Sequence, residues 1–347
     1  MPNSKLLVPG TAGITFVDNT GADVGYPIKM RLGTATDGLL GKSPAELMEL
    51  LSMAHLAGQI APHRTSLKPG TSLRPGHALK VAYNQIPSSF NHFLYDWRAD
   101  MRHSARQLLD FLRERKPTNG RWNIVGHSQG ALLTVLASKM AAENGDPLDP
   151  ASRERFSQLV TSVTMVGAPL AGTVNAARAL IVGDGAGEAA APVFKRILRT
   201  WPSLYQMAPA WPAVVDDQGD DAPVEHQLEH VTGWPHMDVP EDMVERARIA
   251  RLLLRDPLSH LCGDLQVALL FARNRNTGQK LERRNGHLNG DPVVRQKGDS
   301  LVPFDQTIAW IGSHIEPFVT VFNPPVNEHA FLLDDPAVVK RVKKLLR

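Results

Sequence analysis

The residues best suited to chemistry lie in the pentapeptide Gly126-His127-Ser128-Gln129-Gly130. A brief β-rich run, residues 122–125, precedes the pentapeptide, and an alanine-rich helical pattern over residues 131–142 follows it. A serine at a sharp turn from strand to helix needs small neighbours, and such a turn presents its hydroxyl near the N-terminus of the helix. Main-chain N–H groups at that position can stabilise an oxyanion. The pattern therefore predicts that Ser128 is a nucleophile.

A serine nucleophile requires a base, usually histidine, and a carboxylate that orients the base. In hydrolases built around this turn the chain order is serine, acid, histidine, so both partners should follow residue 128. Asp299 lies in a polar turn (KGDSLVPF, residues 297–304), and His329 lies in a loop between an apolar run and the last helical pattern. We predict these two residues as acid and base. The alternatives are Asp264, Asp291 and Asp305 for the acid, and His314 and His287 for the base.

The elements that must position these residues alternate between strand and helix over most of the chain. Such alternation favours a largely parallel α/β sheet. The expected strands are residues 6–8, 78–86, 122–125, 159–166, 266–273 and 317–322, and the expected helices are residues 43–58, 101–115, 131–142 and 335–347.

Residues 175–262 interrupt this alternation. The segment begins with a stretch rich in Gly and Ala, contains three Trp-Pro pairs and has no strand pattern. We predict that it forms an inserted helical cap between two parts of one core, residues 1–174 and 263–347. We also predict substrate contacts for four tryptophans, with ordinary core packing as the competing interpretation. They are Trp97, Trp201, Trp211 and Trp234.

Composition excludes several classes of protein. The chain has 347 residues and a net charge of +3, and no run of Lys or Arg accompanies that charge, which argues against a nucleic-acid binder. The single cysteine, Cys262, excludes an internal disulfide and a cysteine-rich zinc module. No apolar run reaches the length of a membrane span, and residues 1–10 do not resemble a secretory signal. We expect a cytoplasmic protein, with signal-independent export as an alternative.

Two further patterns receive an ordinary interpretation. His226, His230 and His236 could face one way on a helix, but no carboxylate pattern completes a metal site, so we predict no metal. The glycines of residues 183–187 indicate a hinge rather than a phosphate-binding loop.

Five motifs occur in a characteristic order from about residue 5 to the C-terminus. They are Val8-Pro9-Gly10, Asp96-Trp97-Arg98, residues 126–130, Gly167-Ala168-Pro169 with Gly172-Thr173, and residues 298–303. In order and spacing they resemble the lecithin:cholesterol acyltransferase family of α/β-hydrolases. The resemblance implies an α/β-hydrolase fold in which Ser128 is the nucleophile, Asp299 the acid and His329 the base. It also implies that the N–H groups of Thr11 and Gln129 form the oxyanion hole.

The resembling family acts on acyl esters, often of phospholipids, as phospholipases or acyltransferases. We therefore expect a serine hydrolase or O-acyltransferase that takes a lipid-like acyl ester and needs no cofactor. The alternatives are a thioesterase or peptidase on the same fold, and a non-catalytic interaction module. The amphipathic pattern of residues 335–347 favours packing on the sheet, with transient contact to a membrane surface as the alternative.

Overall fold

The computed structural model describes most of the sheet and its helices and leaves several segments out. The described residues are 4–11, 13–17, 74–78, 80–118, 120–143, 155–182, 195–196, 198–217, 224–227, 240–254, 261, 265–284, 287–312, 318–322 and 326–346. The helix expected over residues 43–58, the glycine-rich residues 183–187 and Cys262 lie outside them.

A six-stranded sheet forms the centre of the molecule, and every neighbouring pair of its strands is parallel. The strand order is β12-β9-β6-β5-β1-β4. The strands are β1 (Ser4–Val8), β4 (Asn91–His92), β5 (Trp122–His127), β6 (Val160–Val166), β9 (Gln266–Ala272) and β12 (Val319–Phe322). Because parallel strands end at one edge, the loops that follow β1, β5 and β6 meet there.

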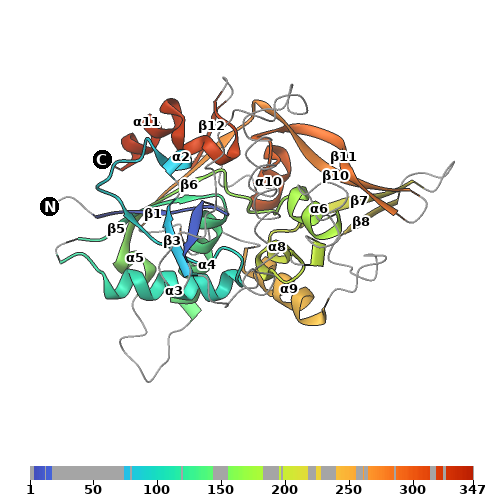
Figure 1. Cartoon of the computed structure of the whole chain (residues 1–347). Helices are drawn as coiled ribbons and strands as arrows, with labels where there is room; N and C mark the ends of the chain where they lie inside the picture. The colour runs from blue at the N-terminus through green and yellow to red at the C-terminus, as the bar shows by residue number, and fades with distance from the viewer. Residues whose placement is uncertain are drawn as a thin grey trace.

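Helices cover both faces of this sheet (Figure 1). One face carries α3 (Met101–Glu114), α4 (Gln129–Glu143) and α5 (Phe156–Leu159). The other carries α2 (Lys80–Tyr83), the 3₁₀-helix η4 (His329–Asp334) and α11 (Pro336–Leu345). Adjacent residues Leu6 and Leu7 belong to the two separate apolar cores, as the alternation of side chains along a strand requires. This arrangement is the α/β-hydrolase fold that the family resemblance implies.

Local sequence explains where the main helices begin. The Asp100 carboxylate caps α3 by accepting the N–H of Arg102, and Asp335 caps α11 by accepting the N–H of Ala337. Pro336 then occupies the first turn of α11, where its missing N–H removes no helical hydrogen bond. Both residues therefore favour a helix that begins at Pro336.

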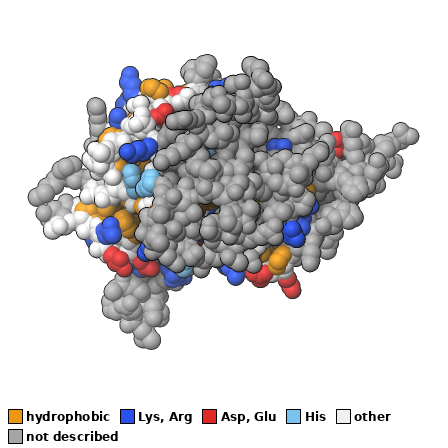
Figure 2. Space-filling model, in the orientation of Figure 1, with side chains coloured by type: hydrophobic (Ala, Val, Ile, Leu, Met, Phe, Trp, Pro, Cys, Tyr) orange, Lys and Arg blue, Asp and Glu red, His pale blue; other side chains and the backbone are white. Residues whose placement is uncertain are grey.

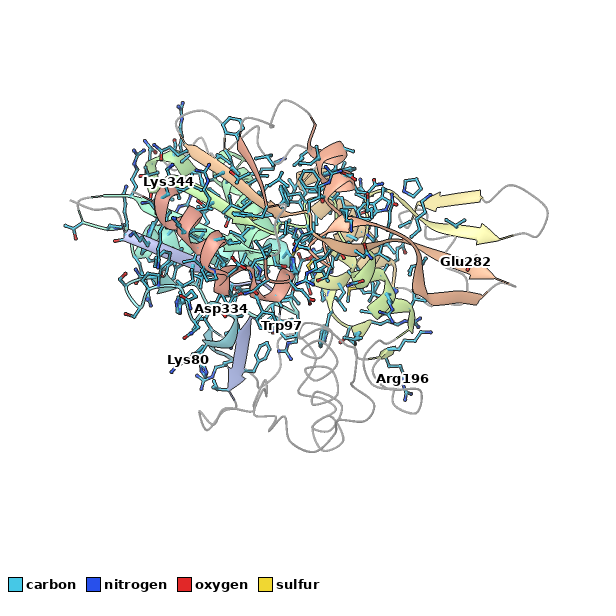
Figure 3. The ribbon with its side chains drawn as sticks, turned by 90° about the horizontal axis from the view of Figure 1, so that it is seen from above. Lys80, Trp97, Arg196, Glu282, Asp334 and Lys344 are labelled. Atoms are coloured by element: carbon cyan, nitrogen blue, oxygen red, sulfur yellow. The ribbon has the colours of Figure 1, made fainter. Side chains whose placement is uncertain are left out.

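A second, four-stranded sheet lies beside the first, and both views place it at one end of the molecule (Figures 1 and 3). Its order is β11-β10-β7-β8, formed by β7 (Pro212–Asp217), β8 (Val224–Gln227), β10 (Arg275–Arg284) and β11 (His287–Gly298). The remaining elements are β2 (Ile14–Val17), β3 (Arg74–Ala78), α6 (Val174–Val182), α8 (Pro202–Gln206), α9 (Glu241–Leu254) and α10 (Phe304–Ile311).

The inserted segment, residues 175–262, differs in part from the expected helical cap. It contains helices, as expected, but it also contributes β7 and β8 to the second sheet. Both strands are short and carry charged residues, so their apolar pattern is too weak to detect. The sheet also takes β10 and β11 from the part of the chain after residue 262, so strands from both sides of the predicted boundary pair with each other.

A second correction concerns residues 78–86, which the alternating pattern predicted to be a strand. Among the described residues of this stretch, Ala78 is the one that lies in a strand, as the last residue of β3. Lys80–Tyr83 instead form the helical turn α2. Periodicity over so few residues fits a strand and a helix equally well. Tertiary contacts favour the helix here, because Ala82 and Tyr83 are buried where α2 packs against η4.

Charged side chains are mixed in sign on the face that Figure 2 shows, where the described Lys and Arg residues are interspersed with Asp and Glu. Within the described residues, no helix is long and apolar enough to cross a membrane.

Candidate active site

Ser128 occupies the turn between β5 and α4 in a strained conformation. Its φ of 51° lies in the left-handed region, which it shares among the described non-glycine residues with Ser300 alone. Its N–H donates to the carbonyl of Val166, 2.9 Å away, and its carbonyl accepts the N–H of Ala131 at 3.0 Å. Strain of this kind is retained where the surrounding structure enforces it, often at functional sites.

The two glycines of the pentapeptide allow this turn to pack closely. A Cβ atom on Gly126 would lie 2.7 Å from the Cα of Ala131. A Cβ atom on Gly130 would collide with the carbonyl of Val8 and lie 2.6 Å from that of Pro9. The helix can therefore start directly beside β1 only because both positions lack a side chain.

The structure brings the three predicted triad residues together. His329 Nε2 lies 2.8 Å from Ser128 Oγ, and His329 Nδ1 lies 2.8 Å from Asp299 Oδ2. All three are buried, with Asp299 only 1% exposed. This is the geometry in which a histidine can take the serine proton while a carboxylate fixes its tautomer.

Main-chain N–H groups fix the orientation of the Asp299 carboxylate. Its Oδ1 accepts the N–H of Leu301 at 3.1 Å and that of Val302 at 2.7 Å. The second oxygen, Oδ2, consequently faces His329. The histidine main chain is tied to the same residue, because its N–H donates to the Asp299 carbonyl at 3.0 Å.

Three residues that the sequence interpretation did not single out support this pair. Gly167, with φ of +57°, lies so close that a Cβ atom would be 3.1 Å from both Asp299 Oδ2 and His329 Nδ1. The Thr173 hydroxyl donates to the Leu301 carbonyl at 2.9 Å, and the Thr277 hydroxyl accepts the Ser300 N–H at 3.0 Å. Gly167 and Thr173 belong to the motif that follows β6, and the family resemblance of that motif is the sequence signal that points to them.

Thr11 and Gln129 are in direct contact beside Ser128. The Thr11 hydroxyl donates to Gln129 Oε1 at 2.8 Å, and Gln129 Nε2 donates to the carbonyl of Trp97 at 3.0 Å. Gln129 is the first residue of α4, where a main-chain N–H has no acceptor within the helix. An oxyanion hole formed by the N–H groups of Thr11 and Gln129 stays a prediction.

The predicted substrate-contacting tryptophans are buried where the structure describes them. Trp97 and Trp201 pack edge to face with ring centroids 5.1 Å apart, and Trp211 donates from Nε1 to the carbonyl of Gln279. Figure 3 labels Trp97 near the middle of the molecule, between the parts that hold the two sheets. Trp234 lies outside the described residues. Contact with a substrate stays a prediction for all four.

The alternative acids and bases are placed less favourably or not described. Asp305 is half exposed and pairs with Arg273 at 3.2 Å. Asp264 and His314 lie outside the described residues, and Asp291 and His287 lie in β11, where their side chains are not described.

Potential metal ligands do not cluster in the described part of the chain. No group of three His, Cys, Asp or Glu residues there could hold a metal ion. His226 lies in β8, and His230 and His236 fall outside the described residues.

Comparison with known proteins reveals likeness in structure but not in sequence. No protein-family model and no curated protein sequence matches the chain. A chain in the crystal structure of the Tle4-Tli4 complex aligns with a TM-score of 0.57 and 12% identity, over 99% of this chain and 98% of that one. At this identity the likeness bears on the fold alone.

Two further structures align with lower scores. Bacillus licheniformis lipase BlEst2 in mature form gives a TM-score of 0.35 at 14% identity, over 74% of this chain and 78% of that one. The NocB thioesterase domain, in covalent complex with a fluorophosphonate nocardicin G analog, gives 0.31 at 12%, over 100% and 95%.

Proposed function

We propose that this protein is a serine hydrolase or O-acyltransferase that acts on acyl esters through Ser128, His329 and Asp299. The observation that supports this most directly is the pair of 2.8 Å contacts from His329, one to Ser128 Oγ and one to Asp299 Oδ2. A buried serine, carboxylate and histidine in this chain order, with the serine strained between strand and helix, suit covalent acyl transfer.

The proposed reaction has two half-reactions. His329 Nε2 accepts the proton of the Ser128 hydroxyl as the serine oxygen attacks the ester carbonyl, and Asp299 stabilises the histidine cation. The N–H groups of Thr11 and Gln129 bind the negatively charged oxygen of the tetrahedral intermediate. His329 then protonates the leaving alcohol, and an acyl group remains on Ser128. Water or a second alcohol, deprotonated by His329, releases that group.

For the substrate we propose an ester with a long acyl chain. The support is that two side chains of the inserted segment, Met207 and Trp201, border the oxyanion side of the site. The sulfur of Met207, directly after α8, lies 3.7 Å from the Thr11 hydroxyl, and Trp201 at the start of α8 packs on Trp97. Because each buried methylene contributes about 0.8 kcal/mol, an apolar wall here would select for chain length.

Labelling by a fluorophosphonate probe tests the nucleophile. The wild-type chain should react at Ser128, and Ser128→Ala should lose labelling and lower ester turnover by about 10⁶-fold. Ser138→Ala is the matched control, because Ser138 is also a buried serine of this region and donates only to the Val135 carbonyl. Labelling that persists in Ser128→Ala would disprove the nucleophile, and a wild-type chain without labelling would favour the interaction module.

A series of p-nitrophenyl esters tests the substrate class. The ratio of kcat/KM for long over short acyl chains should be high in the wild type and should fall in Trp201→Leu. Trp122→Leu is the control, since Trp122 is equally buried but packs against α3, where its Nε1 donates to the Leu112 carbonyl. An equal ratio in both variants would remove the support for a lipid-like ester. Faster turnover of thioesters or peptides than of any ester would identify the alternative class.

A further inference from the structure

One peptide unit beside the nucleophile is held from both sides by buried tyrosines. The Pro9 carbonyl accepts the hydroxyl of Tyr95 at 2.7 Å, and the Gly10 N–H donates to the hydroxyl oxygen of Tyr83 at 2.9 Å. Both tyrosines are almost completely buried. The peptide leads directly to Thr11, so the two hydroxyl groups fix the start of the loop that carries a proposed oxyanion donor.

The loop is shaped to admit the Tyr83 hydroxyl. The Gly13 N–H donates back to the Gly10 carbonyl at 3.0 Å, which closes a tight turn. A Cβ atom on Gly13 would collide with the Tyr83 hydroxyl. The absence of a side chain at this position therefore lets a group from α2 reach the main chain of the turn.

Tyr83 also contacts His127, the residue immediately before the nucleophile. The Tyr83 hydroxyl lies 3.1 Å from His127 Nδ1, and His127 Nε2 lies 2.8 Å from the main-chain carbonyl of His329. The rings of His127 and His329 lie 5.3 Å apart. Through these contacts a continuous chain of hydrogen bonds runs from the turn at Gly10 to the main chain of the proposed base.

The chemistry of the groups determines the direction of each hydrogen bond. The Gly10 N–H can only donate, so the Tyr83 oxygen accepts it and the Tyr83 O–H is left to donate to His127 Nδ1. An unprotonated Nδ1 places the His127 proton on Nε2, which then donates to the His329 carbonyl. Every donor and acceptor in the chain is satisfied by a neutral histidine and a neutral tyrosine.

Burial keeps both side chains neutral. It lowers the pKa of His127 to about 3, with a smaller contribution from the neighbouring His329, and it raises the pKa of Tyr83. The directions of the hydrogen bonds therefore stay the same throughout the range of neutral pH.

We propose that Tyr83 and His127 are positioning residues that couple the loop carrying Thr11 to the main chain of His329. The inference rests on the proposed function, because it assigns these groups a role in aligning the oxyanion hole with the base. The hydrogen bonds of both residues described above go to main-chain groups and to each other rather than to the reacting atoms. Loss of either one should misalign both halves of the site together, and misplacement of this kind lowers kcat more than it changes KM.

Four single variants test the coupling by kcat and KM on one ester and by the rate of fluorophosphonate labelling. Tyr83→Phe and His127→Asn should lower kcat and the labelling rate by about 10- to 100-fold, with KM changed by less than about 3-fold. His127→Gln should retain more activity than His127→Asn, because a glutamine amide reaches the place of Nε2 and can still donate to the His329 carbonyl. Tyr205→Phe is the control, because it removes a hydroxyl that donates to the Arg199 carbonyl instead.

Double variants separate a relay from two independent supports. If Tyr83 acts through His127, Tyr83→Phe should lower kcat by a much smaller factor in the His127→Gln background than in the wild type. Tyr205→Phe should have the same small effect on kcat in both backgrounds. The proposal is overturned if the Tyr83→Phe and His127→Gln effects on kcat multiply, or if Tyr83→Phe behaves like Tyr205→Phe.

Histidine ¹⁵N NMR of the intact chain provides a readout that does not depend on turnover. His127 should be neutral with its proton on Nε2 from about pH 5 to pH 8, and Tyr83→Phe should shift the Nδ1 resonance. A proton on Nδ1 would overturn the relay even in an active enzyme. If the wild-type chain lacks fluorophosphonate reactivity, the proposed function fails and the coupling loses its catalytic role, whatever the tautomer.

Discussion

Ser128 and the Asp299–His329 pair reach the same point from two regions that are built differently. Ser128 is held by its own chain neighbours, in a turn between β5 and α4 that closes over two glycines. Asp299 and His329 follow strands of different sheets, and contacts from distant parts of the chain hold them. Local backbone geometry thus positions Ser128, the proposed nucleophile, and tertiary structure positions Asp299 and His329, the proposed acid and base.

This difference predicts which side of the site should tolerate substitutions with only a partial loss of activity. A turn enforced by backbone geometry stays in place as long as β5 and α4 fold. The proposed acid and base instead depend on several hydrogen bonds, each of which can be removed without unfolding the sheet. We therefore expect graded losses of activity on the acid and base side.

The largest expected effect on that side comes from Asp299→Asn. The asparagine oxygen should take the place of Oδ1, which accepts the N–H groups of Leu301 and Val302. Its amide nitrogen would then donate to His329 Nδ1, forcing the histidine proton onto Nε2, where it cannot accept the Ser128 proton. We expect kcat to fall by about 10⁴-fold with little change in thermal stability.

Asp305→Asn is the matched control for this substitution, because Asp305 belongs to the same region but pairs with Arg273 at the surface. Steady-state kinetics of both variants checks the assignment. If Asp305→Asn lowers kcat more than Asp299→Asn does, Asp299 is not the acid.

The same difference explains what the sequence could predict. Ser128 was identifiable because its strand, turn and helix are contiguous, and the elements flanking it formed as expected. Asp299 and His329 were identifiable from chain order and placement in loops. The supports of these residues were not, because Thr277 and Tyr83 are close to the site only after β10 and α2 have packed.

Two parts of the fold escaped prediction for related reasons. The β10–β11 hairpin is largely polar, since much of its sequence consists of charged and amide residues, so it lacks the alternation by which strands are recognised. The turn α2 is too short for its periodicity to be distinguished from that of a strand. In both cases a distant part of the chain contributes, β7 by pairing with β10 and η4 by packing against α2, so local preference alone does not determine the structure.

A smaller effect on the acid and base side is expected from Gly167→Ala. The new Cβ atom would lie 2.9 Å from Leu332 Cδ1 and 3.1 Å from the atoms that join Asp299 to His329. Displacement of that pair should lower kcat by about 100-fold, and the left-handed backbone should lower the free energy of unfolding by about 1–2 kcal/mol. Gly312→Ala strains the backbone at φ of 84°, at the end of α10, and should reduce stability alone. Equal kcat in the two variants would contradict the steric role of Gly167.

The dependence of stability on pH sharpens the comparison, because a buried neutral histidine at the end of β5, His127, contacts the main chain of His329 and so joins the two regions. His127 faces Tyr83, His329 and Asp299, and burial lowers its pKa to about 3 in the folded state. Below about pH 6.5 the unfolded chain binds a proton that the folded chain does not bind. The free energy of unfolding should consequently fall by about 1.4 kcal/mol, or about tenfold in the unfolding equilibrium, for each pH unit between about 6.5 and 3.

Urea unfolding at about pH 6 and pH 5 measures this contribution, with His127→Gln as the reference because glutamine does not titrate. The wild type should lose more stability between the two conditions than His127→Gln does. Parallel pH dependence in the two proteins would mean that His127 is protonated in the folded state. The Asp100 carboxyl does not interfere between about pH 5 and pH 6. Although burial raises its pKa, hydrogen bonds from Arg102 and Gln206 lower the pKa to about 2.

The smallest effect is expected from Thr277→Val, which tests whether the second sheet helps to position the acid. Thr277 is 1% exposed, and its hydroxyl accepts the N–H of Ser300, a residue held at φ of 82°. Valine has nearly the same shape but cannot accept, so the loop after β11 loses one support. The N–H groups of Leu301 and Val302 still bind the Asp299 carboxylate, and the loss in kcat should therefore be only about 3- to 10-fold.

Thr307→Val, which removes an equally buried hydroxyl from the carbonyl of Pro303, is the control. If Thr277→Val equals this control in kcat, the second sheet does not position the acid. A loss as large as that of Asp299→Asn would mean that the carboxylate depends on this single contact with β10 rather than on several weak supports.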